Sequence, residues 1–269
     1  LEAYYINNLD KAISLLSEMV EYPRVNPKVL ANAKLSLADF YLMKGEIWES
    51  TLLYSQVDKQ YKDDLLGHEA RYRNAMLSYF AGDFEWAQTQ FNVLKASTSK
   101  LIANDALDRS IFIMDNMALD TTVTPLLKFS EAELLVFQNK FDNAFTKLDS
   151  IRSQFPEHSL EDDAIYLKSK IYFKMRDYDK CELMLKTVME KYPDGIRADN
   201  AIFKLAELYE NQMDKKKEAA MLYEKIFFDY SSSTFSVEAR KRFRRLTEEE
   251  GVEIDDDLSK EEIFMQGGM

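Results

Sequence analysis

Residues 162–193 carry the pattern on which the rest of the chain is built, DDAIYLKSKIYFKMRDYDKCELMLKTVMEKYP. Its pattern returns in residues 199–230, DNAIFKLAELYENQMDKKKEAAMLYEKIFFDY. In both stretches apolar residues recur at spacings of three and four, which is typical of amphipathic helices. Small residues fall where two helices must touch, Ser169 and Cys181 in the first stretch. Each stretch is therefore expected to form a hairpin of two antiparallel helices joined by a short turn.

The same pattern extends over most of the chain with one period. Gly45 and Gly82 are 37 residues apart, and so are Ala144 and Cys181. Glycine and proline are scarce, at 7 and 5 residues, which favours long helices joined by short loops. A fixed period of this length indicates stacked helical hairpins. The hairpins are expected at about 31–62, 68–96, 125–156, 162–193 and 199–230.

The remaining segments complete a single expected solenoid over residues 1–246. Residues 1–23 resemble a clipped repeat that ends at Pro23. Residues 101–117 form an extra helix whose apolar stripe is too broad for one wet face, so it should be packed on two sides. Either this helix is left unpaired or the pairing of hairpins changes here. Residues 234–246 should form a capping helix that begins after the serines at 231–233.

Residues 247–269 form an acidic tail. Ser259 and Glu262 make a capping box within it, which predicts a short helix carrying Phe264.

Two sets of small residues occupy equivalent positions in the five hairpins. The first set is Ala38, Ala75, Ala132, Ser169 and Ala206, and the second is Ser50, Ala87, Ala144, Cys181 and Ala219. This pattern resembles the tetratricopeptide repeat family. Lys34, Arg71 and Lys128 depart from it at a site that is usually aromatic, and the period exceeds the family's usual length of about 34 residues. The resemblance implies an all-α fold, a right-handed solenoid with a C-terminal capping helix, and a role in protein binding.

The final third also resembles bacterial envelope proteins with such repeats. The resemblance rests on YPDGIRADNA at 192–201 and EARKRFRRL at 238–246. It is to the periplasmic coordinator of the Tol-Pal system and to the outer-membrane assembly lipoprotein. It implies a periplasmic or envelope-associated protein. Because the chain begins at Leu1 inside a repeat-like pattern, we also expect a fragment of a longer protein.

Composition argues against several classes of function. A net charge of −12 opposes nucleic-acid binding, which needs concentrated Lys and Arg. No apolar run approaches the ~20 residues of a membrane span. The single cysteine, Cys181, cannot form an intrachain disulfide and is expected to be a buried thiol. His68 and His158 are the only histidines, and no phosphate loop, catalytic triad order or metal-ligand spacing is present. We therefore expect no catalytic residue, cofactor or metal, and no enzymatic activity.

The family resemblance places a partner in a concave groove. Projecting the repeat template gives these groove residues: Leu35, Asp39, Leu42, Tyr72, Met76, Tyr79, Phe80, Phe129, Glu133, Tyr166, Lys170 and Phe173. Phe203 and Glu207 continue the same face. Tyr72, Met76, Tyr79 and Phe80 should form an exposed apolar patch, unless these side chains belong to the core between helices. Asp39 and Met76 stand where some family members carry the asparagines of a carboxylate clamp, which argues against that ligand class.

Three functions remain open from the sequence. The first is a non-catalytic scaffold that binds a protein or peptide in the groove. The second is a structural module that serves homo-oligomerisation or docks onto further repeats. The third is a periplasmic assembly factor. The sequence identifies no particular partner.

Overall fold

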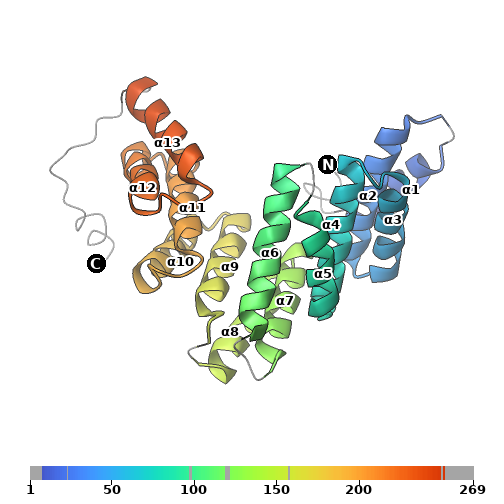
Figure 1. Cartoon of the computed structure of the whole chain (residues 1–269), viewed down its shortest axis with the longest axis horizontal. Coiled ribbons are helices and arrows are strands. Elements are labelled where there is room, and N and C mark those ends of the chain that lie inside the picture. Colours follow the sequence, from blue (N-terminus) through green and yellow to red (C-terminus); the bar gives the residue numbers. More distant parts are fainter. Residues whose placement is uncertain are drawn as a thin grey trace. The chain divides into compact units, whose positions relative to one another are not determined.

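The protein is all-α, as the sequence predicts. The structure, a computed structural model, describes residues 8–22, 24–96, 99–118, 122–156, 158–249 and 251. Within these ranges the chain forms thirteen α-helices and no strand (Figure 1). Residues 1–7 of the clipped repeat, Pro23 and the expected tail helix around Phe264 lie outside the described residues.

The chain divides into two compact units, one up to Leu160 and the other from Glu161. Unit 1 contains eight of the described helices. They are α1 (Leu9–Val20), α2 (Pro27–Lys44), α3 (Ile47–Gln60), α4 (Leu65–Phe80), α5 (Phe84–Leu94), α6 (Lys100–Ala118), α7 (Thr124–Phe137) and α8 (Phe141–Gln154).

Unit 2 contains five described helices and a π-helical turn. They are α9 (Glu161–Lys174), α10 (Tyr178–Lys191), α11 (Ala198–Asn211), α12 (Lys216–Asp229), α13 (Ser236–Arg244) and the turn Arg245–Glu249. Consecutive helices pack as pairs, α9 with α10 and α11 with α12, and α13 covers α12. The cap of α13 differs from the expected one: Phe235 precedes the helix and supplies no side-chain hydrogen bond, while Ser233 Oγ accepts from the Phe235 amide at 3.1 Å.

Proline and polar residues mark the starts of several helices. Pro27 opens α2, where its missing N–H costs nothing. The Asn26 side chain caps the same helix by accepting from the Lys28 amide at 2.9 Å. Asp83 and Asp177 cap α5 and α10. Each side chain accepts a hydrogen bond from the backbone amide three residues later, that of Trp86 or Lys180. These caps stabilise the ends of helices that are joined by connections of only a few residues.

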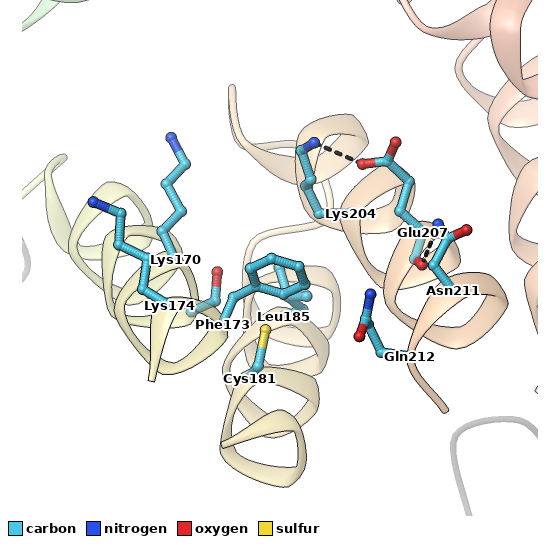
Figure 2. A pocket seen from close by; sticks show the side chains of 10 residues that line it. Lys170, Phe173, Lys174, Cys181, Leu185, Lys204, Glu207, Asn211 and Gln212 are labelled. Carbon is cyan, nitrogen blue, oxygen red and sulfur yellow. Dashed lines mark hydrogen bonds and ion pairs between the residues drawn. The ribbon is translucent and has the colours of Figure 1, made fainter. Parts of the chain in front are cut away.

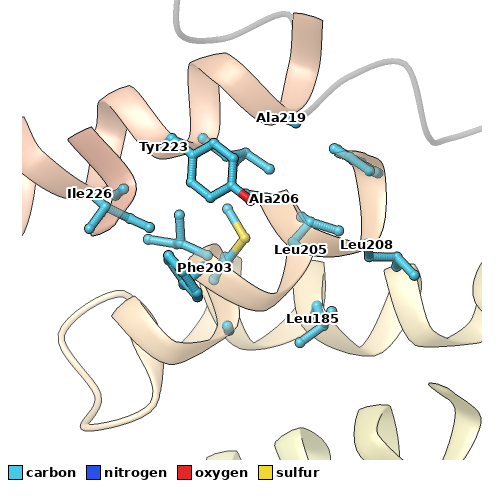
Figure 3. Packing of buried hydrophobic residues seen from close by; sticks show 14 of the residues in the cluster. Leu185, Phe203, Leu205, Ala206, Leu208, Ala219, Tyr223 and Ile226 are labelled. Atoms are coloured by element: carbon cyan, nitrogen blue, oxygen red, sulfur yellow. The ribbon is translucent and has the colours of Figure 1, made fainter. Parts of the chain in front are cut away.

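The small-residue positions lie where helices meet. All ten are buried, and none is more than 2% exposed. Figure 3 shows Ala206 of α11 and Ala219 of α12 within the core of unit 2, beside Phe203 and Tyr223. Because packed helix axes lie ~8–10 Å apart, a larger side chain at either position would separate them.

The pairing of helices changes after α5. α6 packs mainly on α5, while α7 pairs with α8 and also packs on α4. Leu134 and Phe137 of α7 pack against the buried cluster of α2, α3 and α4. Beyond its last turn, Gln138 Nε2 donates to the carbonyl oxygen of Leu42 at 3.1 Å. α7 therefore lies against the helices that were expected to form one end of an open groove.

Candidate functional site: the groove of unit 2

Four of the nine predicted groove residues of unit 1 are buried, and the other five are half-buried. Leu35, Leu42, Tyr79 and Phe129 are buried, with at most 4% of each residue exposed. The Tyr79 hydroxyl donates to Glu133 Oε2 at 2.7 Å, which joins α4 to α7. Their side chains therefore hold helices together.

The two carboxylates among these predicted groove residues, Glu133 and Asp39, pair with arginines inside unit 1. Arg109 of α6 donates to Glu133 at 2.8 Å, and its guanidinium lies 5.0 Å from the centre of the Tyr79 ring. Asp39 accepts from the Tyr54 hydroxyl at 2.5 Å and from Arg73 at 2.6 Å. Burial raises the pKa of Asp39 and outweighs the lowering effect of Arg73. Asp39 and Glu133 thus form hydrogen bonds that join helices within unit 1.

The exposed apolar patch expected at Tyr72, Met76, Tyr79 and Phe80 is not found. Tyr79 is completely buried, and the other three are half-buried. The Tyr72 ring lies 5.4 Å from that of Phe91, and Phe80 packs against the α2–α4 core. The correction has a physical cause: α6 and α7 cover the face that the repeat template leaves open.

The predicted groove residues of unit 2 lie on α9 and differ in exposure. Tyr166 is buried, whereas Lys170 is exposed and Phe173 is 46% exposed. Lys170 and Phe173 line an open groove of about 510 Å³ (Figure 2). We call it the lysine groove. Its lining comprises Ser169, Lys170, Phe173, Lys174, Cys181, Leu185, Lys204, Glu207, Asn211 and Gln212.

Three helices build the lysine groove. α9 and α11 contribute the two walls, and α10 contributes Cys181 and Leu185 at the base. Asp163 and Arg197, at the start of α9 and just before α11, form a buried ion pair with 2.5 Å between Arg197 Nε and Asp163 Oδ1. The guanidinium also lies 5.9 Å from the Tyr166 ring centre. This pair fixes the two walls of the groove at one end.

The lysine groove is locally basic in an acidic protein. Lys170, Lys174 and Lys204 line it together with the single carboxylate of Glu207. Lys204 Nζ lies 2.6 Å from Glu207 Oε2, and Arg242 of α13 approaches the other oxygen at 3.0 Å. Lys170 Nζ lies 4.6 Å from the Tyr166 ring centre. With three lysines against one carboxylate, the lining carries a net positive charge.

Cys181 is the buried thiol that the sequence predicts. Burial, with the nearby carboxylates of Asp177 and Glu182, raises its pKa to about 11. The group is therefore protonated near neutral pH and unsuited to nucleophilic attack. Among the residues that the structure describes, no cluster of three His, Cys, Asp or Glu side chains could hold a metal ion.

Sequence reasoning missed part of the lining. Lys174, Lys204 and Asn211 were not predicted, because no one-residue signal separates a wall lysine from a solvated one. The buried pair of Asp163 and Arg197 was missed as well. Asp162 and Asp163 lie in the first turn of α9, where acidic residues are common, so their burial could not be predicted from the sequence. Buried carboxylates need partners, and Arg197 is the partner of Asp163.

Helix pairs on a common template, with a groove between neighbouring pairs, define the class of helical-repeat proteins. Residues 163–195 and 200–233 match the model of the tetratricopeptide repeat family. They correspond to α9–α10 and α11–α12, and the first three of these helices build the lysine groove. Unit 2 thus contains two helix pairs that match the tetratricopeptide repeat.

Other comparisons add little about function. A comparison with curated proteins returns no match. Among solved structures, the chain is similar to a tetratricopeptide repeat protein from Parabacteroides merdae, with 14% identity and a TM-score of 0.36. The similarity covers 90% of this chain and 93% of that one. Within the described residues, no helix is both long enough and apolar enough to cross a membrane.

Proposed function

We propose that this chain is a non-catalytic protein-interaction module that binds a peptide segment of a partner protein in the lysine groove. Repeats of this family generally mediate protein–protein interaction. The observation that carries the proposal is Phe173, an aromatic side chain 46% exposed inside an open groove with lysines on both walls. An exposed aromatic ring in a concave site offers apolar area that water solvates poorly.

The charges of the lysine groove favour one chemistry in the partner segment. Lys170 and Lys174 flank Phe173 on α9, and Lys204 faces them from α11 (Figure 2). A segment with an apolar side chain beside Asp or Glu residues would cover the ring and pair with these ammonium groups. The net charge of −12 for the whole chain would slow the approach of such a segment elsewhere on the surface.

A peptide-display selection on the full chain tests this proposal. We expect the selected peptides to contain an apolar residue next to acidic residues. Phe173→Ala should weaken their binding by about tenfold, since it removes roughly 1–2 kcal/mol of contact. Lys170→Glu should weaken it further and reverse its dependence on salt.

The matched control is Phe228→Ala on α12. Phe228 is 68% exposed and does not line the lysine groove. It should bind the selected peptides as the wild type does. Peptides that bind Phe173→Ala and Lys170→Glu with unchanged affinity would place the binding surface elsewhere.

A further inference from the structure

Unit 1 contains a second groove, which holds both tryptophans of the chain. It runs between α3 and α5 over α4 and has a volume of about 500 Å³. Trp48 of α3 is 83% exposed and Trp86 of α5 is 56% exposed. Tryptophan is on average highly buried, so two such exposed rings in one groove need an explanation. We call this site the tryptophan groove.

The surroundings of the tryptophan groove are acidic. Residues 45–52 and 78–94, which contain the two tryptophans, hold four carboxylates and no Lys or Arg. They are Glu46, Glu49, Asp83 and Glu85. Lys44, just before this stretch, neutralises one of them by approaching Glu46 at 2.9 Å.

Two carboxylates belong to the lining itself. Asp58 lies 2.7 Å from Arg71 of α4, which balances its charge. Asp83 caps α5, with one oxygen accepting from the Trp86 amide at 3.3 Å. The lining contains no Lys or Arg. A neutral or acidic occupant would remove Asp83 from water without supplying a cation in return, which is unfavourable.

We propose that the tryptophan groove binds a basic segment of a partner protein, with Arg or Lys side chains against the rings of Trp48 and Trp86. Tryptophan is the strongest aromatic partner of a cation, and a guanidinium also stacks flat on it. The carboxylates near the rings supply the complementary charge. A nucleic acid does not fit, because its phosphates would meet carboxylates. This site shares no residue with the lysine groove.

Intrinsic fluorescence of the full chain reads this site directly, because Trp48 and Trp86 are its only tryptophans. The probe is a short synthetic peptide in which arginine alternates with leucine. Its control replaces every arginine by glutamate. We expect saturable changes in tryptophan emission with the arginine peptide, weakening as NaCl rises, and none with the glutamate peptide.

Two variants separate charge from fold. Asp83→Asn removes the charge and keeps a side chain that caps helices equally well. Trp48→Leu removes one exposed ring and leaves Trp86 to report. Each variant should lower the affinity for the arginine peptide by about three- to tenfold. Phe228→Leu, an exposed aromatic in unit 2, should change nothing.

Three results would overturn the proposal. The first is an equal response to the arginine and glutamate peptides, or a response to neither. The second is unchanged affinity in both Asp83→Asn and Trp48→Leu. The third is an emission change with zwitterionic lipid vesicles but not with the arginine peptide, which would assign the rings to a membrane surface.

Discussion

At the scale of single residues, the turn inside each described hairpin depends on one residue with positive φ. These residues are Gly45, Gly82, Asn139, Arg176 and Asp214, with φ between 54° and 96°. Only glycine adopts this conformation without steric cost, and asparagine and aspartate tolerate it better than other residues. Arg176 is thus the least suited residue of the five.

These turns allow a paired prediction. Gly45→Ala should destabilise the protein by roughly 1 kcal/mol through backbone strain alone, since no atom lies within 4 Å of the added Cβ. Arg176→Gly should raise stability by up to about 1 kcal/mol by relieving the same strain. Urea unfolding followed by circular dichroism measures both free energies. If Gly45→Ala stabilised the protein and Arg176→Gly destabilised it, the turn conformations would be assigned wrongly.

At the scale of helices, small side chains set how closely a pair can pack. Ala206 is completely buried at the contact of α11 with α12. Ala206→Leu should overpack this contact and cost about 1–3 kcal/mol of unfolding free energy. Glu190→Leu introduces the same side chain at an exposed position of α10 and should stay within about 0.5 kcal/mol. Comparable losses in the two variants would refute the assigned register.

The sequence carries the information for these helix pairs because their contacts are local. Ala38 and Ser50, for example, are small because their helices touch within one hairpin. The Ser50 hydroxyl donates to the Ala38 carbonyl at 2.8 Å. A pattern that repeats every hairpin therefore predicts the helices and their buried faces.

The groove residues were harder to predict because their exposure depends on distant segments. Tyr79 and Phe173 lie on corresponding faces of α4 and α9, yet one is buried and the other half exposed. The difference arises from α6 and α7, which follow a break in the period and cover α4. Periodicity describes the face of a helix and not the segment that later packs on it.

At the scale of the whole molecule, the chain contains two compact units, whose boundary lies between Leu160 and Glu161. The cluster in Figure 3 belongs to unit 2, and the clusters around α2 belong to unit 1. The single solenoid expected over residues 1–246 therefore stays a prediction. We expect the two units to differ in stability and to unfold in separate transitions.

Two spectroscopic probes test this expectation on one sample. Both tryptophans lie in unit 1, so their emission reports unit 1 alone, whereas circular dichroism reports helices of both units. We expect the two urea transitions to have different midpoints. Superimposable transitions would show one cooperative unit.

Photo-crosslinking shows directly whether the lysine groove holds the partner. A benzoylphenylalanine replaces Phe173 in one sample and Phe228 in another, and each full chain is irradiated with lysate from its source. Both positions are exposed aromatics of unit 2, but only position 173 lines the groove. We predict a covalent partner adduct from position 173 that Lys170→Glu suppresses, and none from position 228. Equal adducts from both positions, or an adduct from position 228 alone, would place the partner outside the lysine groove.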